Sequence, residues 1–344
     1  MTRAIRVIQW ATGVTGMMSL RHVLSRPDLE LVAVRVYDVD KAGVDVGTLC
    51  GLPEVGILAT TDRDAIIGTE ADVVLYMGKV ETDTPGCFAD VGDLLASGKN
   101  VVATGSRFIH PGSLHASLAD DIEKACRAGG SSFLGLGLYP GFVGESLVPI
   151  LSRLTQRTGH INIREVLNYS TYASHDLIFN AMGFGHAPDD TTPLLTNTEY
   201  AASAWIGSAT VVAQALGLEI RGVQGYRHVA LTPRALSVAA GEIPAGTVGA
   251  MRFGVVVDCG ETTLTVEHLT RMADDLAPDW PTEIGYSVTF EGEPSMRIHL
   301  VIGSHDQDHA EQGCLATAMH AINAIPTVVA AEPGPYDLST IALT

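Results

Sequence analysis

Short, continuous apolar runs alternate with amphipathic stretches over the first part of the chain. The apolar runs predict strands at residues 7–10, 31–36, 73–77, 101–103 and 133–138. Runs without polar alternation suit strands that are covered on both faces, as in a parallel sheet. Amphipathic stretches predict helices at residues 16–25, 88–97 and 114–128. This alternation of strand and helix predicts an α/β fold, with a doubly wound parallel sheet of the Rossmann type.

The pattern changes after about residue 145. Helices are predicted at residues 147–157 and 198–216, and a last helix at 314–324 is expected to end before Pro326. Strands are predicted at residues 161–172, 223–230, 248–259, 263–271, 286–290 and 296–301. The run at 263–271 alternates polar and apolar residues, as a strand with one buried face requires. We therefore expect a C-terminal α+β domain with an open mixed or antiparallel sheet.

These patterns divide the chain into three regions. We expect a dinucleotide-binding Rossmann domain at residues 1–142 and a substrate-binding and dimerisation domain at 143–310. A C-terminal helix and tail, residues 311–344, are expected to pack back on the Rossmann domain. A chain of 344 residues with 46% hydrophobic residues is long and apolar enough for two buried cores.

Charge and composition narrow the classes of partner. A net charge of −18 would repel phosphate backbones and anionic lipids, so neither nucleic acid nor a membrane is the expected partner. The five cysteines are odd in number and widely spaced, which indicates reduced thiols. The first residues lack the long apolar stretch of a signal peptide, and no uninterrupted apolar run would cross a bilayer. The expected compartment is the cytoplasm.

A glycine-containing turn follows the first predicted strand and opens the first helix. It matches A-x-G-x-x-G, a variant of the dinucleotide fingerprint, and consists of Ala11, Thr12, Gly13, Val14, Thr15 and Gly16. Gly13 would let the backbone approach a pyrophosphate, and Gly16 would let helix and strand pack closely. The alternative is a simple tight turn, but the strand before it and the helix after it favour cofactor binding.

The end of the second predicted strand gives conflicting signals about the cofactor. Asp38 would accept hydrogen bonds from ribose hydroxyls and favour NAD, unless it only shapes the turn. Arg35 would pair with a 2′-phosphate and favour NADP. The sequence therefore predicts NAD or NADP without choosing between them.

Five segments in order resemble one enzyme family. They are the glycine turn and residues 101–104, 135–142, 182–185 and 321–326. Together they resemble the 2,4-diaminopentanoate dehydrogenase and native amine dehydrogenase family, whose N-terminal domain is similar to that of dihydrodipicolinate reductase. The resemblance implies a homodimeric, NAD(P)-dependent enzyme that interconverts a primary amine with a ketone and ammonia.

The resemblance also assigns residues, and the chain departs from it at two of them. It places Thr104 at the cofactor, with Tyr139, Pro140, Gly141 and Phe142 beside the nicotinamide. Tyr139 stands where the family usually has Asn. Ser106 stands where the family usually has a catalytic Glu, and a hydroxyl cannot replace a carboxylate near neutral pH. This departure leaves the amine chemistry open, unless another residue supplies it.

Several further side chains lie on segments expected to face the cofactor cleft. The catalytic candidates are Ser106, His110, Tyr139 and Asp176. His110 and Asp176 have the alternative of shaping a turn or starting a helix, and Tyr139 that of stacking. The substrate-binding candidates, with core packing or solvation as the alternative, are Arg107, His175, Phe179, Met182 and Phe184. The favoured role of Glu145 is to cap a helix.

No arrangement of residues predicts a metal site. Residues 305–309 contain two His and two Asp, but an acidic surface loop explains them better than a cation site. The sequence therefore predicts an NAD(P)-dependent oxidoreductase that takes a small amine, ketone or imine. One alternative is an NAD(P)H-dependent carbonyl or cyclic-imine reductase, and another is a non-catalytic dinucleotide-binding sensor.

Overall fold

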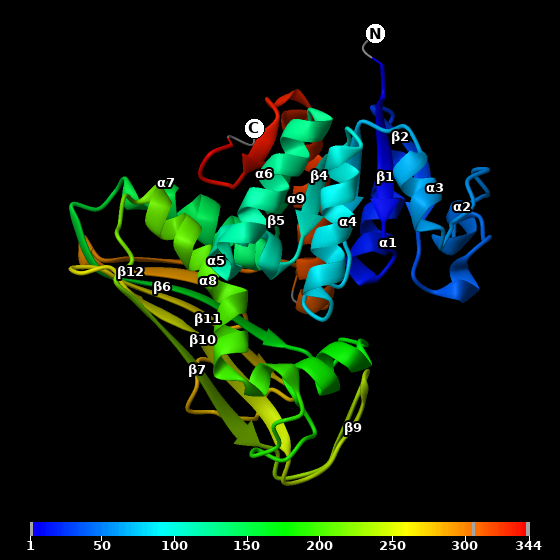
Figure 1. Ribbon diagram of the computed structural model, residues 1–344. Helices are drawn as coiled ribbons and strands as arrows, with labels where there is room; N and C mark the ends of the chain where they lie inside the picture. The colour runs from blue at the N-terminus through cyan, green and yellow to red at the C-terminus, as the bar shows by residue number, and fades with distance from the viewer. Residues whose placement is uncertain (1–2, 305–306, 342–344) are drawn as a thin grey trace. The chain divides into compact units, whose positions relative to one another are not determined.

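The chain folds into two compact units (Figure 1). The computed structural model describes residues 3–304 and 307–341. The first unit comprises Met1–Leu138 and Cys314–Thr344, and the second comprises Tyr139–Gly313. These boundaries fall a few residues from the expected ones, and the C-terminal segment belongs to the N-terminal unit.

A six-stranded sheet with only parallel pairings forms the centre of the first unit. In spatial order its strands are β14 (Gly334–Tyr336), β5 (Ser132–Leu136), β4 (Asn100–Thr104), β3 (Val73–Tyr76), β1 (Ile5–Trp10) and β2 (Leu29–Arg35). The chain proceeds from β1 to one side and from β3 to the other, so the topological switch point lies between these strands. The predicted doubly wound parallel sheet is confirmed.

Two pairs of helices pack in this unit, and each pair contributes to a different apolar core. α1 (Val14–Ser25) and α9 (His309–Ala330) contribute to one core. α4 (Thr84–Ala96) and α6 (Ala116–Gly129) contribute to the other. All four residues of β3 are buried, which explains its continuous apolar sequence. Shorter segments are α2 (Val46–Leu49), α3 (Arg63–Gly68), α5 (Pro111–Leu114), η1 (Val39–Lys41) and η2 (Ser106–Phe108).

In the described part of the chain, one helix, α9, is long and apolar enough to span a membrane by length and composition. Its residues Ile322, Ile325 and Val328 are fully buried in the core of the first unit. The expectation that this helix ends before Pro326 is wrong, because α9 continues to Ala330. Proline removes one backbone hydrogen bond inside a helix, and the burial of Val328 offsets that loss.

A mixed six-stranded sheet forms the second unit. In spatial order its strands are β13 (Met296–Leu300), β12 (Gly285–Glu293), β6 (Arg157–Asn168), β11 (Thr263–Arg271), β10 (Val248–Asp258) and β7 (Gly222–Leu231). β6 and β11 pair in parallel, and the other four pairings are antiparallel. β8 (Leu236–Val238) and β9 (Gly241–Ile243) form a separate ribbon. The predicted mixed sheet is confirmed.

The long helix α8 (Thr198–Ala215) packs against β7, β10 and β11 of this sheet. Its residues Ala201, Trp205 and Val212 are buried and share one helical face. Asn197 caps its N-terminus, since its side-chain oxygen accepts a hydrogen bond from the Tyr200 amide at 3.0 Å. The apolar spacing and this cap explain the predicted helix.

Shorter helical segments connect these elements. They are η3 (Leu138–Ser146), α7 (Leu147–Ser152), η4 (Asp176–Met182) and η5 (Leu194–Thr196). α7 ends earlier than the predicted boundary at residue 157, because strand β6 already begins at Arg157. The pairing of β6 with β12 takes up the backbone groups that a longer helix would have used.

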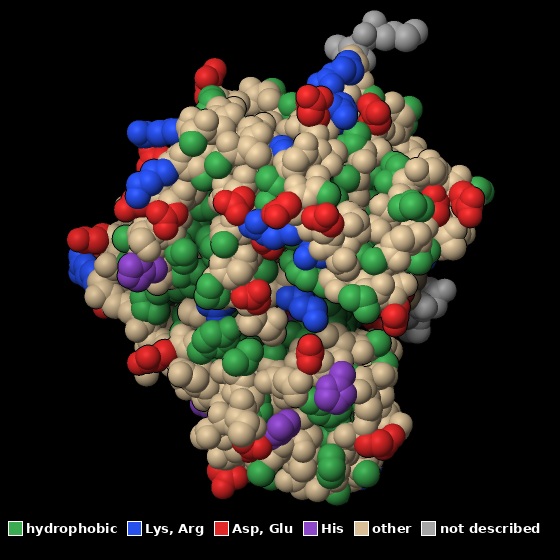
Figure 2. All heavy atoms as spheres, turned by 45° about the vertical axis from the view of Figure 1, so that its right-hand side comes forward, with side chains coloured by type: hydrophobic (Ala, Val, Ile, Leu, Met, Phe, Trp, Pro, Cys, Tyr) green, Lys and Arg blue, Asp and Glu red, His purple; other side chains and the backbone are tan. Residues whose placement is uncertain are grey.

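Acidic side chains are spread over the face shown in Figure 2, with basic side chains among them. The chain has 39 acidic and 21 basic residues. On this face the acidic excess is distributed rather than gathered into one patch.

Candidate active site

The turn between β1 and α1 uses its two glycines differently. Gly13 is the N-cap residue of α1, and a Cβ built on it would meet no other heavy atom within 4 Å. A Cβ on Gly16 would lie 2.3 Å from the carbonyl oxygen of Ala11. Val14 and Thr15 begin the first helical turn, whose free N–H groups attract phosphate. Gly13 therefore leaves space beside an anion-binding helix N-terminus, and Gly16 allows close packing.

Two buried polar residues, Gln9 and Ser19, stabilise this turn through hydrogen bonds. Ala11 has a φ of 75°, in the left-handed region that favours glycine. Its carbonyl oxygen accepts a hydrogen bond from Gln9 Nε2 at 3.1 Å, and Ser19 Oγ donates to Gln9 Oε1 at 2.8 Å. The adjacent Thr12 is also buried. The sequence reading missed Gln9 and Ser19, because one polar residue in an apolar strand does not reveal its partner.

Arg35, at the end of β2, packs against aromatic rings. Its guanidinium carbon lies 4.7 Å from the ring centroid of Tyr37 and 5.5 Å from that of Trp10. Trp10 Nε1 donates to the Tyr37 hydroxyl at 3.0 Å, which joins the two rings. Nη1 of Arg35 donates to the Val36 carbonyl, while its buried Nε has no hydrogen-bond partner among the described residues. A guanidinium held in this way suits a phosphate group.

Asp38 and Lys41 lie just beyond β2. The exposed Asp38 caps η1, because its Oδ1 accepts a hydrogen bond from the Asp40 amide at 3.0 Å. Lys41 Nζ donates to the carbonyl oxygen of Thr12 at 3.1 Å, so its charge lies at the glycine turn. Lys41 follows the end of the predicted strand, and for that reason the sequence reading did not select it.

Ser106 is hydrogen-bonded to a carboxylate from another loop. Its Oγ lies 3.0 Å from both carboxylate oxygens of Glu81, and its backbone N–H donates to Glu81 Oε1 at 2.9 Å. The buried Arg107 side chain pairs with the same group, with Nε 3.4 Å from Oε2. The structure thus places a carboxylate at Ser106 that the sequence reading missed, because Glu81 lies 25 residues earlier in the chain.

Thr104 and His110 flank this group in sequence. Thr104 is the buried last residue of β4. The half-buried His110 precedes Pro111 at the start of α5, and its carbonyl accepts hydrogen bonds from the amide and hydroxyl of Ser113. Burial lowers the pKa of His110, which favours the neutral imidazole near pH 7. His110 therefore shapes the turn, and its catalytic role stays a prediction.

In the second unit, the Tyr139 hydroxyl is bound to strand backbone. It lies 2.9 Å from the Ile163 carbonyl oxygen and 2.7 Å from that of Glu267, and it accepts a hydrogen bond from the Glu267 amide at 3.1 Å. Burial raises the pKa of Tyr139 well above its ordinary value. These contacts anchor the ring to β6 and β11, and donation to a substrate oxygen stays a prediction.

The turn after Tyr139 is stabilised by a buried carboxyl group. Pro140 and Gly141 leave the helical conformation, and Gly141 has a φ of 135°. The Gly141 amide donates to Glu145 Oε2 at 2.9 Å, and Glu145 is 1% exposed. Burial raises the pKa of Glu145 to about 7. Phe142 completes the turn, which Glu145 supports through the backbone.

His175 and Asp176 lie where η4 begins. The exposed Asp176 is in its first turn and accepts a hydrogen bond from Asn180 Nδ2 at 2.8 Å. The ring centroids of His175 and Phe179 lie 4.7 Å apart. Asp176 therefore takes a helix-starting position, and its catalytic role stays a prediction.

The predicted apolar wall around residues 179–185 is largely packed inside the second unit. Met182 is 3% exposed and Phe184 is fully buried, as core residues are. Phe179 is half-buried, and Cβ atoms built on Gly185 and Gly241 would lie 3.2 and 3.3 Å from its ring. Phe179 is therefore the member of this group with surface left for a ligand.

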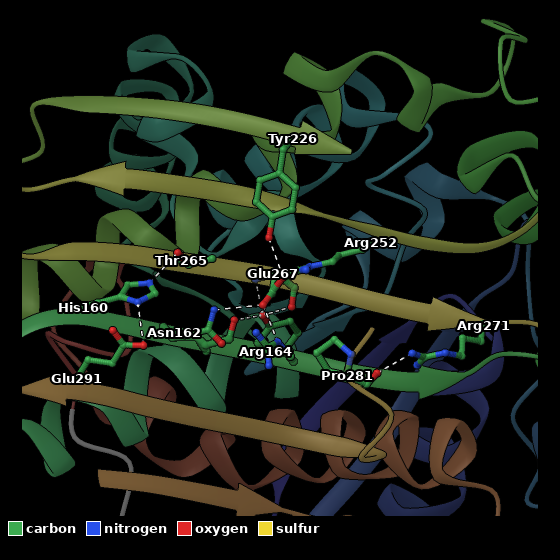
Figure 3. Close-up of polar contacts among 12 residues, drawn as sticks. His160, Asn162, Arg164, Tyr226, Arg252, Thr265, Glu267, Arg271, Pro281 and Glu291 are labelled. Atoms are coloured by element: carbon green, nitrogen blue, oxygen red, sulfur yellow. Dashed lines mark hydrogen bonds and ion pairs between the residues drawn. The ribbon is translucent and has the colours of Figure 1, made fainter. Parts of the chain in front are cut away.

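A buried glutamate lies on the polar face of the second sheet (Figure 3). Glu267 is fully buried, and it accepts hydrogen bonds from Arg164 Nε at 2.5 Å and from Arg252 Nε at 2.6 Å. Asn162 Nδ2 and the Tyr226 hydroxyl donate to it at 3.1 and 2.8 Å. Burial alone would raise the pKa of Glu267, but the hydrogen bond from Arg252 and the charge of Arg164 hold it below its ordinary value.

This network forms the floor of a shallow basin of about 470 Å³. The sequence reading missed it, because the strands contribute its members singly or at alternate positions. The lining residues are His160, Asn162, Arg164, Tyr226, His228, Arg252, Val256, Thr265, Thr289 and Glu291.

Within residues 3–304 and 307–341, no group of three His, Cys, Asp or Glu side chains could hold a metal ion. His305 and Asp306, from the loop considered above, lie outside the described residues. Among the predicted catalytic residues, Ser106 and His110 belong to the first unit, and Tyr139 and Asp176 belong to the second.

Comparison with known proteins gives consistent matches. Residues 142–344 match the family model of the 2,4-diaminopentanoate dehydrogenase C-terminal domain. The chain is 32% identical to an amine dehydrogenase of Streptomyces virginiae, over 98% of this chain and 96% of that one. It is 22% identical to the 2,4-diaminopentanoate dehydrogenase of Acetoanaerobium sticklandii, over 80% and 75% of the two chains. The solved amine dehydrogenase of Mycobacterium smegmatis has the same fold, with a TM-score of 0.83, 17% identity and coverage of 99% and 97%.

Proposed function

The chain belongs to the family of the 2,4-diaminopentanoate and amine dehydrogenases, and from this premise we propose that it interconverts a primary amine with a ketone and ammonia. Membership makes it a dinucleotide-dependent dehydrogenase. The observation that carries the proposal is the open space at Gly13, beside the N-terminus of α1 and next to the switch point of the sheet. Such a site fits the pyrophosphate of NAD or NADP.

The first unit carries groups that would bind two parts of the cofactor, its pyrophosphate and its adenosine ribose. The N–H groups at the start of α1 would hold the pyrophosphate. The buried Nε of Arg35 and the ammonium group of Lys41 would meet a phosphate on the adenosine ribose. When bound, the nicotinamide would supply the hydride acceptor for amine oxidation and the hydride donor for the reverse reaction.

The protein must also orient the amine and accept a proton from it. A primary amine is an ammonium ion near neutral pH, and it must lose a proton before its C–H bond can give up a hydride. Arg107, His175 and Phe179 remain the proposed substrate contacts, while Met182 and Phe184 would support the apolar wall from within the core. Phe179 has the greatest apolar exposure of the three apolar members, so it is the first of them to test.

Assembly as a homodimer is part of the same proposal. Val223, Leu231 and Val301 lie at or beside strands of the second sheet and are 40% to 47% exposed. These residues lie at or next to β7 and β13, the two edge strands of this sheet, and an exposed apolar edge offers a surface on which another chain can pair. A second copy of the chain is the partner that the family resemblance implies.

Turnover with three substrate panels tests the proposed function. The purified protein receives NADH or NADPH with ketones plus ammonium, with ketones alone, or with cyclic imines, and product is measured by mass spectrometry. We expect amine from the first panel. Alcohol from ketones alone, or reduction of cyclic imines without ammonium, would identify a carbonyl or imine reductase instead. Tight cofactor binding with no product in any panel would identify a sensor.

A further inference from the structure

We propose that Glu81 supplies the carboxylate that takes the proton from the bound amine, and that Ser106 holds this carboxylate in place. The inference rests on the function proposed above. Glu81 lies between β3 and α4, and Ser106 lies just beyond β4. The Ser106 hydroxyl is 3.0 Å from both oxygens of Glu81, and the Ser106 amide donates to Oε1 at 2.9 Å.

The backbone around Ser106 allows this close approach. Gly105 has a φ of 130°, a conformation that other residues rarely adopt. A Cβ at this position would lie 2.5 Å from Val80 Cγ1 and 3.4 Å from Glu81 Oε1. The hydroxyl of Thr84 donates to the Val80 carbonyl at 2.8 Å and ties the same segment to the start of α4. The contact between Glu81 and Ser106 therefore depends on the absence of a side chain at Gly105.

The carboxylate of Glu81 lies beyond the carboxyl ends of the parallel strands, where open α/β folds bind ligands. β3 and β4 pair in parallel with Tyr76 opposite Ala103, so the segments that follow them leave at the same edge. β1 pairs with β3 with Trp10 opposite Tyr76, and the glycine turn leaves there as well. Ligands of such sheets bind outside the carboxyl ends of the strands, at the switch point. Glu81 is thus one strand away from the cofactor turn.

The exposure of the three side chains suits an anchored acceptor. The side chain of Glu81 is 39% exposed, while Arg107 is 6% and Ser106 is 9% exposed. The two buried residues fix the position of the carboxylate, and its own exposure leaves it accessible to a ligand. Arg107 Nε lies 3.4 Å from Oε2 and restricts the carboxylate further. A fixed carboxylate of this kind attracts an ammonium group.

With Glu81 as the proton acceptor, amine oxidation conserves atoms and charge. The substrate ammonium transfers one N–H proton to the Glu81 carboxylate, which leaves a neutral amine. The C–H bond then breaks with its electron pair, and the hydride passes to the bound nicotinamide, so the amine becomes an iminium ion. Water adds to the iminium carbon, ammonium leaves, and a ketone remains. Glu81 releases its proton to solvent, and the reverse sequence forms the amine.

Three variants of the full chain, each loaded with cofactor, test the proposal. Glu81→Gln removes the charge with little change in shape. Glu70→Gln is the matched control, since Glu70 is exposed and precedes β3 at the opposite edge. The double variant Glu81→Gln/Ser106→Glu returns a carboxylate to the neighbouring position. The measurements are kcat for amine oxidation and calorimetric binding of isopropylammonium in the presence of NADH or NADPH.

We expect Glu81→Gln to lower kcat about 10²- to 10⁴-fold, to weaken isopropylammonium binding, and to leave cofactor binding unchanged. The double variant should recover part of both losses, which a merely structural role for Glu81 would not produce. Glu81→Gln that matches Glu70→Gln in kcat and in ammonium binding would overturn the proposal. If the wild type oxidises no amine, the proposed function fails, and isopropylammonium binding alone tests whether Glu81 holds an ammonium group. The proposal for Glu81 is then overturned if the wild type binds no isopropylammonium, or if Glu81→Gln and Glu70→Gln bind it equally well.

Discussion

The backbone amide of Gly141 donates a hydrogen bond to Oε2 of Glu145 at 2.9 Å. The two residues lie in one turn, whose backbone departs from helical geometry at Gly141. Glu145 is 1% exposed, so this hydrogen bond is made in a low-dielectric environment. The turn therefore depends on a titratable group whose protonated form burial favours.

The first prediction concerns stability and pH. The pKa of Glu145 is raised to about 7 in the folded protein, against an ordinary value of 4.5. Between these pH values the folded chain holds a proton that the unfolded chain has lost, so the free energy of unfolding falls as pH rises. At 1.36 kcal/mol per pH unit, the fall is about 3 kcal/mol. Urea unfolding of the wild type and Glu145→Gln from pH 4 to 8 measures it. Curves that run parallel for the two proteins would contradict this account.

The second prediction separates the two glycines of the cofactor turn. Gly13→Val should fold normally, because the space at Gly13 is open, and it should greatly weaken NAD(P)H binding. Gly16→Ala should destabilise the fold by about 1–3 kcal/mol, because its Cβ would collide with the Ala11 carbonyl. Fluorescence titration and thermal unfolding measure the two effects. A Gly13→Val variant that binds cofactor like the wild type would place the site elsewhere.

The third prediction concerns the choice between NAD and NADP. If Arg35 binds a 2′-phosphate, Arg35→Ala should weaken NADP binding about tenfold or more and NAD binding much less. Asp38→Ala is the companion variant, and it should selectively weaken NAD binding, because the cap of η1 uses Oδ1 of Asp38 and a ribose hydroxyl would donate to Oδ2. Dissociation constants of both cofactors for both variants give the comparison. An unchanged NAD to NADP ratio in both would show that the ribose is bound by other residues.

The fourth prediction concerns assembly. Light scattering during size-exclusion chromatography at micromolar concentration should give twice the 36.2 kDa mass of the chain. Replacing the exposed Val223 or Leu231 with Lys should shift the mass toward that of the monomer, since a buried lysine disfavours an interface. Leu154→Lys, at an exposed position outside the strands, provides the control. A monomeric wild type would refute the dimer.

Burial on both faces explains why the sequence predicts the main strands of the first unit. The four residues of β3 are apolar because all four are buried. β14 has no comparable pattern, since Gly334, Pro335 and Tyr336 form a strand through their pairing with β5. The continuation of α9 past Pro326 was unpredictable for a related reason. Core packing outweighed a local rule there.

The candidate site shows the same division between local and distant signals. The glycine turn was predictable because its two glycines, strand and helix are contiguous. The pairing of Ser106 with Glu81 joins residues 25 positions apart, and it forms because β3 and β4 are neighbours. No spacing rule in one sequence conveys that contact. Lys41 escaped prediction for the same reason, since the carbonyl that it binds lies 29 residues earlier. Gln9 escaped prediction because its partner is a backbone carbonyl, a group that every residue carries.

An enzyme that makes and breaks a carbon–nitrogen bond must transfer the nitrogen of ammonium into its product. The most direct test incubates the enzyme with a ketone panel, NADH or NADPH, and ¹⁵N-labelled ammonium, and follows the products by mass spectrometry. We expect primary amines that carry the ¹⁵N label, with one equivalent of cofactor oxidised for each amine formed. Cofactor oxidation that yields only alcohol, with no ¹⁵N in any product, would contradict it.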